Sequence, residues 1–60
     1  MYTVMVKWKG SQRAERLGHG QTVTRRRDAR VFRCKLAAEN AARVARLDRP
    51  CVERWWVAPF

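Results

Sequence analysis

The sequence predicts a small α+β domain whose elements follow the order β-β-α-β, and three features of the pattern support this fold class. Residues 2–9 alternate apolar and polar side chains, which is the period of a half-buried strand. Residues 24–47 contain no Gly or Pro and are rich in Ala, Leu and Arg, which favours one long helix. Residues 51–57 are rich in Val and Trp and predict a final strand. A chain of 60 residues has room for a single domain, residues 1–60.

The first strand is expected to bury one face and to turn back through a tight hairpin. Its two faces are Tyr2, Val4, Val6 and Trp8 on one side and Thr3, Met5, Lys7 and Lys9 on the other. Gly10-Ser11 matches a two-residue type II′ turn, so the chain should fold back at Gln12. The return strand, residues 12–17, is mostly polar. Gly18-His19-Gly20 interrupts this strand, and residues 21–23 are expected to resume it after a bulge or loop.

The predicted helix begins at Thr24, a residue type suited to the N-cap, and ends before Pro50, which disfavours helical geometry in the residue preceding it. The stripe expected to pack on the sheet contains Ala29, Phe32, Leu36, Ala37, Asn40, Val44 and Leu47. A second stripe of small residues on the opposite side contains Val31, Cys34, Ala38, Ala41, Ala42 and Ala45. This second stripe, and in particular Val31, Cys34, Ala38, Ala42 and Ala45, is a possible dimer or docking face, because small side chains let another backbone approach. The alternative is an ordinary Ala-rich solvent face.

The three strands are expected to form an antiparallel sheet in which the first strand lies between the second and the last. The last strand leaves the helix in the direction antiparallel to the first, which brings these two strands together. The helix then lies across one face of the sheet, and the other face stays open to water or to a partner.

The charge of the chain predicts an acidic partner. There are 14 Lys and Arg residues against 5 Asp and Glu residues, which gives a formal net charge of +9. Arginine outnumbers lysine by 11 to 3, and the guanidinium group can bind phosphate or carboxylate with two parallel hydrogen bonds. A GC-rich coding sequence would explain the preference for Arg over Lys, but it would not explain the excess of base over acid.

A basic cluster coincides with the start of the predicted helix. Each cation at the positive end of a helix dipole costs about 0.3–1 kcal/mol, and only Asp28 lies close enough to offset Arg25, Arg26 and Arg27. Arg30 and Arg33 extend the cluster along one edge of the helix. We therefore expect these arginines to bind phosphates or carboxylates of a partner. The alternative is a solvated basic surface whose Arg stems cover apolar area.

The adjacent residues Trp55 and Trp56 should point to opposite faces of the last strand. We expect Trp56 to point outward with Arg54, because Arg54 can extend into water beside it, and Trp55 to enter the core. Trp56, Arg54, Lys7 and Lys9 would then share the open face, a mixture of aromatic and basic groups suited to nucleic-acid stacking or to a protein interface. The alternative is a surface Trp that only covers the sheet edge.

The sequence offers no convincing set of catalytic, cofactor-binding or metal-binding residues. His19 is the only histidine and lies between two glycines, where nothing would fix its orientation for general-base catalysis. The carboxylates Glu15, Glu39 and Glu53 are not paired in spacing, and His19, Cys34 and Cys51 match no zinc-binding pattern. We expect free thiols at Cys34 and Cys51, with a disulfide between them as the alternative. The protein is therefore expected not to be an enzyme.

The chain contains no apolar run of about 20 residues and does not begin like a signal peptide, so we expect a cytoplasmic protein without a membrane partner. The basic β-β-α-β pattern with the run from Asp28 to Ala41, DARVFRCKLAAENA, resembles the compact accessory proteins that phages encode, anti-CRISPR inhibitors among them. The resemblance implies a stoichiometric inhibitor in the host cytoplasm that docks on a defence protein or ribonucleoprotein complex. A charge of +9 excludes mimicry of DNA.

Three functions remain open on the sequence. The first is the inhibitor or accessory protein just described, which binds through Arg25 to Arg30 and an exposed Trp. The second is a protein that binds DNA or RNA directly. The third is a small structural or assembly protein that dimerises through the stripe of small residues.

Overall fold

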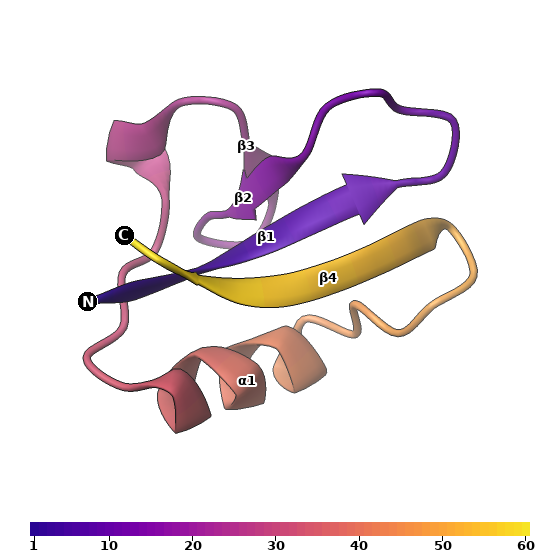
Figure 1. The fold of residues 1–60 in the computed structure, drawn as a ribbon. Helices are drawn as coiled ribbons and strands as arrows, with labels where there is room; N and C mark the ends of the chain where they lie inside the picture. Colours follow the sequence, from indigo (N-terminus) through magenta and orange to yellow (C-terminus); the bar gives the residue numbers. More distant parts are fainter.

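The computed structural model describes residues 1–60 and contains four strands and one α-helix (Figure 1). In chain order the elements are β1 (Tyr2–Trp8), β2 (Glu15–Leu17), β3 (Thr22–Val23), the short 3-10 helix η1 (Arg26–Asp28), α1 (Lys35–Val44) and β4 (Val52–Pro59). The strands form one antiparallel sheet in the order β3-β2-β1-β4. The predicted α+β class, with one helix and an antiparallel sheet, is confirmed, whereas the predicted number and order of strands are wrong.

The core lies between α1 and the face of β1 that the alternation predicts. Val4 and Val6 are fully buried there, and the half-buried Tyr2 and Trp8 pack at the two ends of the same row. On β4, Val57 lies opposite Val4 and completes the apolar face. The remaining buried apolar side chains are Leu17, Phe32, Ala38, Ala42, Leu47 and Val52. Only 10 of the 60 residues are buried, so each core side chain carries much of the stability.

The additional strand arises where the sequence analysis expected a bulge. The N–H of Gly18 donates to the C=O of Gln21 at 2.7 Å, which closes a second hairpin, and β3 then pairs antiparallel with β2. A Cβ atom at position 18 would lie 2.8 Å from the Val23 side chain, so this turn requires glycine. Residues 21–23 therefore form a separate strand at the sheet edge and do not resume the return strand.

The first hairpin is also looser than predicted. A turn closes at Trp8, whose C=O accepts a hydrogen bond from the N–H of Ser11 at 3.1 Å, and Gly10 takes the positive φ of 82° that the turn needs. The chain then runs without regular pairing until β2 begins at Glu15, opposite Val6. The expected two-residue type II′ turn is wrong because Gly10 occupies the second central position and not the first.

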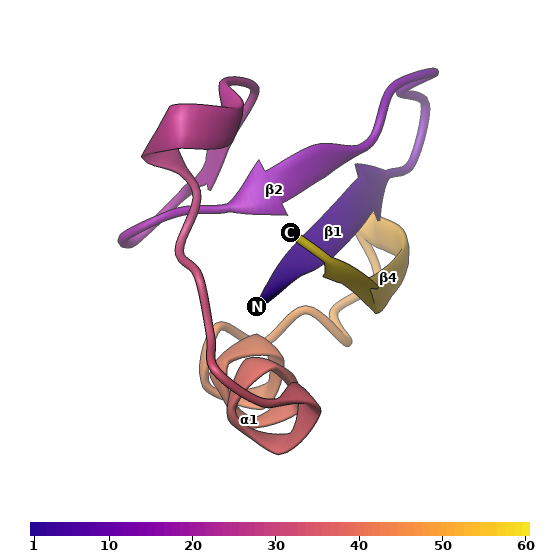
Figure 2. The same ribbon diagram turned by 60° about the vertical axis from the view of Figure 1, so that its left-hand side comes forward.

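The helix is much shorter than the predicted span of residues 24–47, because hydrogen bonds to β1 and β2 hold the segment between η1 and α1 out of helical geometry. Phe32 pairs with Tyr2, the N–H of Arg30 donates to the C=O of Leu17 at 2.9 Å, and the hydroxyl of Thr3 donates to the C=O of Arg30 at 3.3 Å. Figure 2 shows this segment running from η1 past the start of β1 to α1. Hydrogen bonds to distant strands thus outweigh the helix propensity of the segment.

The face of α1 that packs on the sheet is opposite to the predicted one. Ala38 and Ala42 are buried to 0% and 1% exposure, whereas Leu36 and Val44 are 62% and 85% exposed. The alanines let the helix backbone approach β1 and β4 closely, which larger residues would prevent.

The predicted dimer or docking stripe is therefore wrong at its centre, because Ala38 and Ala42 belong to the core. Its other members are placed differently: Val31 and Cys34 precede the helix and are exposed, and Ala45 is half-buried against the core.

A left-handed residue ends α1 three residues before the predicted stop. Arg46 has φ 58°, its N–H donates to the C=O of Arg43 at 3.0 Å, and the N–H of Leu47 donates to the C=O of Ala42 at 3.2 Å. These two bonds form a Schellman motif, in which the buried Leu47 supplies the hydrophobic contact. Pro50 lies in the turn that follows and does not set the end of the helix.

Candidate binding surface

The sheet face turned away from α1 carries a row of side chains that crosses all four strands. The backbone register places Val23 beside Arg16, Arg16 beside Met5, and Met5 beside Trp56. Because Val4 lies in the core under α1, alternation along β1 directs this row to the other side. The next row pairs Lys7 with Arg54. We call the surface formed by Val23, Arg16, Met5, Trp56, Lys7 and Arg54 the outer sheet face.

Trp56 and Arg54 form a stacked pair on the outer sheet face. The guanidinium carbon of Arg54 lies 4.8 Å from the centroid of the Trp56 ring, within the range of a cation–π contact. Trp55, in contrast, packs against the core, so the two indoles are oriented as the sequence analysis expected. Both remain half-buried. The stack places a cation over an aromatic ring on the face of the sheet opposite to the core, and Figure 1 shows α1 beside β1 and β4.

Lys7 is not available as a free cation, because it forms the only salt bridge of the protein. Its Nζ lies 2.8 Å from Oε2 of Glu53. An irregularity in the β1–β4 register next to Lys7 lets the exposed Glu53 reach this face. The hydrogen bond from Lys7, and then its charge, hold the pKa of Glu53 below the ordinary value against the opposing effect of desolvation, and Arg54 and Lys9 lower the pKa by smaller amounts. Lys9 is exposed in the turn after β1.

The predicted arginine cluster at the start of a helix does not exist in that form. Arg25 precedes the 3-10 helix η1, and Arg26 and Arg27 lie within it. The helix α1 begins only at Lys35. Arg26 stacks on the ring of Phe60 at 4.4 Å and donates to the backbone carbonyl of Phe60. Arg25 and Arg27 are exposed. The expected energetic cost of cations at a long helix N-terminus therefore does not apply.

The other two arginines of the predicted cluster lie on the extended segment between η1 and α1. Arg30 is half-buried and stacks on the ring of Phe32 at 5.0 Å, whereas Arg33 is exposed just before the N-cap residue Cys34. Lys35, at the first position of α1, lies 5.9 Å from the ring of Tyr2. The structure thus disperses Arg25 to Arg33 over one end of the molecule and does not align them along a single helix edge.

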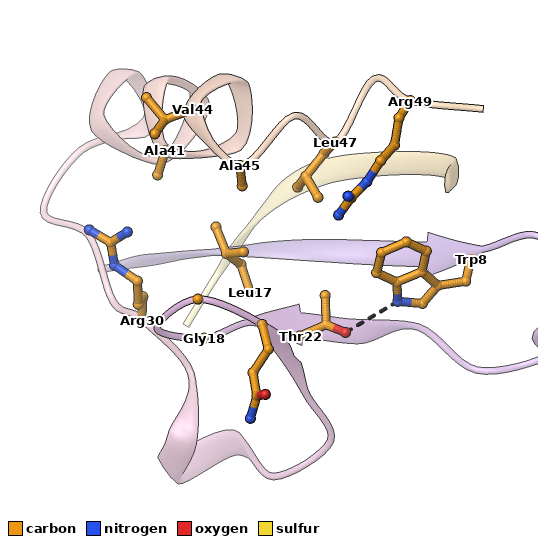
Figure 3. A pocket seen from close by; sticks show the side chains of 12 residues that line it. Trp8, Leu17, Gly18, Thr22, Arg30, Ala41, Val44, Ala45, Leu47 and Arg49 are labelled. Carbon is orange, nitrogen blue, oxygen red and sulfur yellow. Dashed lines mark hydrogen bonds between the residues drawn. The ribbon is translucent and has the colours of Figure 1, made fainter. Parts of the chain in front are cut away.

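A groove of about 600 Å³ lies between α1 and the β2–β3 hairpin (Figure 3). Leu17, Leu47 and Val44 contribute its apolar surface, while Arg30 and Arg49 stand toward its opposite ends. No acidic residue lines it. The groove can accommodate an apolar group with an anionic end. Sequence analysis missed it because its wall depends on the unpredicted β2–β3 hairpin.

One wall of this groove is fixed by a chain of hydrogen bonds that ends on a carboxylate. The indole N–H of Trp8 donates to Oγ1 of Thr22 at 3.2 Å, and the Thr22 hydroxyl donates to Oε1 of Glu15 at 2.5 Å. Arg49 covers the Trp8 ring at 5.4 Å. Trp8 and Thr22 therefore already have their polar partners, and Arg30, Arg49 and the exposed Gln21 remain to contact a ligand.

The residues considered for redox or metal chemistry lie apart from these surfaces. Cys34 and Cys51 are free and exposed. His19 is exposed in the β2–β3 turn, and no three His, Cys, Asp or Glu side chains come together in a metal-binding arrangement. None of the helices has the length and apolar character needed to cross a bilayer.

Comparison with known proteins finds no match to this chain among family models, curated proteins or solved structures. The features of the chain that bear on its function are therefore those of its own geometry: the outer sheet face combines stacked aromatic and basic groups, and the groove combines apolar and basic groups.

Proposed function

We propose that this protein is a non-enzymatic binding protein that contacts single-stranded nucleic acid through its outer sheet face. The observation that carries the proposal is the stack of Arg54 on Trp56, with Met5 beside Trp56 and Arg16 beyond Met5 in the same row. An indole on an open sheet is a stacking platform for a base, and neighbouring arginines bind the phosphates that join successive bases. Direct DNA or RNA binding is the second of the three functions expected from the sequence, where Lys7 and Lys9 were expected beside Arg54 and Trp56.

A single strand fits this surface better than a duplex does. The bases of a duplex are already stacked on one another, whereas unpaired bases can be splayed onto an aromatic side chain. The strand β1 and its neighbours also present a broad surface, with no projecting helix that could enter a major groove. The net charge of +9 adds long-range attraction to any polyanion.

The test is binding of a fluorescently labelled oligonucleotide to the full chain, followed by anisotropy at several salt concentrations. Base stacking on an aromatic residue is worth about 1–3 kcal/mol, so Trp56→Ala should weaken binding roughly 5- to 150-fold. Arg54→Gln should weaken it as well. The matched control is Arg43→Gln, which removes the same charge from the exposed side of α1. Equal losses for Arg54→Gln and Arg43→Gln would show that only net charge matters and would refute the proposed surface.

Salt dependence gives a second criterion. Binding to a single strand should weaken with a log–log slope of about −0.7 for each phosphate contacted. Arg54→Gln should reduce this slope if Arg54 contacts a phosphate, and Trp56→Ala should leave it nearly unchanged because stacking releases no counterions. A Trp56→Ala variant that binds with the parent's affinity would remove the observation on which the proposal rests.

A second candidate is the inhibitor function that the phage resemblance implies. The observation in its favour is the pair of exposed apolar residues Leu36 and Val44 on α1, which a protein partner could cover. It ranks second because its main argument, three arginines at a long helix start, does not apply to this fold. A Leu36→Gln, Val44→Gln double variant should lose binding to such a protein partner while retaining oligonucleotide binding.

A further inference from the structure

Strand β4 lies at the edge of the sheet and offers an unpaired backbone to a second chain. It spans Val52–Pro59, and the only strand that pairs with it is β1. The opposite sheet edge is formed by β3, which has only two residues. A long unpaired edge is a template for pairing with another strand, because its N–H and C=O groups still need partners.

The register shows which backbone groups of β4 face outward. The N–H of Phe60 donates to the C=O of Met1 at 3.0 Å, and hydrogen-bonded pairs alternate along an antiparallel ladder. Ala58 and Trp56 are therefore bonded to β1, whereas the N–H and C=O groups of Trp55 and Val57 point away from it. Pro59 lies two positions beyond Val57, so its backbone N atom also points away from β1. This N atom carries no hydrogen, and it therefore lies on the free edge of the sheet.

We propose that β4 pairs antiparallel with β4 of a second copy of this chain, about a twofold axis that passes beside Trp56. In this register Trp55 of one copy faces Val57 of the other, so every outward N–H and C=O of both residues is used. A register centred on Val57 would place Trp55 opposite Pro59, which cannot donate. Near the start of β4, the irregularity at Glu53 limits the regular pairing in the other direction. The pairing produces a continuous sheet twice as wide as that of one copy.

The side chains of β4 are complementary to themselves in this register. On the core side, Trp55 lies opposite Val57, a favourable aromatic and β-branched pair. On the outer side, Trp56 lies opposite its own equivalent, and Arg54 lies opposite Ala58, so no two cations face each other directly. The apolar or aromatic character of the four residues from Trp55 to Ala58 thus supports pairing on both faces.

The charge of the chain gives this dimer an unusual dependence on salt. Each copy carries +9, so two copies repel one another at low ionic strength, and added salt screens the repulsion. Dimerisation should therefore strengthen as salt rises, whereas nucleic-acid binding should weaken. The dimer goes beyond the proposed function and is tested without nucleic acid, so the failure of one does not imply the failure of the other.

The experiment is sedimentation of the full chain over a range of protein concentrations at about 0.05 and 0.5 M NaCl. We expect a dimer whose Kd is lower at the higher salt. Ala58→Glu places a carboxylate opposite Arg54 of the second copy, and Ala58→Lys places a cation there. Two such pairs per dimer should lower the Kd for Glu and raise it for Lys, each roughly 2- to 30-fold. The controls Ala37→Glu and Ala37→Lys make the same charge changes on the exposed side of α1.

Two results would overturn the proposal. One is a chain that stays monomeric at millimolar concentration, and the other is a set of Ala58 variants that shift the Kd no differently from the Ala37 variants. Amide exchange on the unsubstituted chain decides the matter even if the Ala58 variants do not fold. In the dimer the N–H groups of Trp55 and Val57 should be protected as strongly as that of Trp56, and protection of Trp56 alone would show that the edge is free.

Discussion

Phe32 and Tyr2 exchange both of their backbone hydrogen bonds, each 2.8 Å long, although they are far apart in the sequence. This pair joins the segment after η1 to the start of β1 and forces it into extended geometry. Phe32 is 9% exposed and belongs to the core. The contact therefore fixes where α1 begins and also contributes one of the largest buried side chains.

Truncation at Phe32 and at Leu36 should have very different effects. Phe32→Ala removes a buried aromatic ring and should cost about 3–5 kcal/mol, enough to unfold much of so small a domain. Leu36→Ala should change stability by no more than about 0.5 kcal/mol, because the side chain is 62% exposed. Urea denaturation followed by Trp fluorescence measures both. A Leu36→Ala variant that unfolds like Phe32→Ala would indicate that the helix packs through its other face.

The buried alanines of α1 should resist enlargement. Ala42→Leu places extra methylenes where the helix meets the sheet and should cost about 1–3 kcal/mol, despite the good helix propensity of Leu. Ala37→Leu is the matched control, because Ala37 is exposed on the same helix and can accept the larger side chain. Thermal melting compares the two variants. Equal melting temperatures would contradict the close approach of the helix backbone to the sheet.

The sequence predicts an element correctly where one face of that element is buried and the other is exposed, because apolar and polar residues then alternate. β1 has the expected alternation, and the last strand supplies one indole to the core and one to the outer sheet face, because strand geometry alone separates adjacent side chains. The strand that ends at Val23 was missed, because two residues are too few to show a period. The start of the helix was predicted wrongly for another reason. Residues 24–34 have helix-compatible composition, but they form only the short helix η1, because Arg30 and Phe32 are hydrogen-bonded to Tyr2, Thr3 and Leu17, which are distant in sequence.

The faces of α1 could not be assigned from hydrophobicity alone. Leu36 and Val44 are more apolar than Ala38 and Ala42, so a pattern that ranks residues by size selects the wrong stripe. Burial here follows from how closely the helix approaches the sheet. The arginine cluster was misjudged as a consequence, since its meaning depended on a helix start that lies at Lys35.

The salt bridge between Lys7 and Glu53 should be visible in the titration of the carboxylate. Lys7 lowers the pKa of Glu53, so the stability that this pair contributes is present above the unfolded pKa of about 4.3 and is lost as pH falls through the folded pKa. Lys7→Gln should raise the pKa of Glu53 toward its ordinary value, and Lys35→Gln, which removes a charge at the start of α1, should not. NMR titration of the Glu53 carboxyl carbon measures the shift. An unchanged pKa in Lys7→Gln would mean that the pair does not persist in solution.

The end of α1 gives a prediction in which the same substitution has opposite effects at two nearby positions. Arg46 has φ 58°, a conformation that costs a non-glycine residue about 1 kcal/mol, so Arg46→Gly should stabilise the protein by up to that amount. Arg43 lies within α1, where Gly should be less favourable by about 1 kcal/mol. Both variants lose one positive charge, so the comparison cancels the change in net charge.

Chemical denaturation of the two variants provides the measurement, with the unsubstituted chain as reference. Arg46→Gly should unfold at higher denaturant concentration and Arg43→Gly at lower, with the same dependence on denaturant in both, because neither change alters the surface that unfolding exposes. The N–H of Leu47 should remain protected from exchange in Arg46→Gly, since its bond to Ala42 closes the Schellman motif. Destabilisation by Arg46→Gly would show that α1 does not end in this motif, and that Leu47 is held in the core by other contacts.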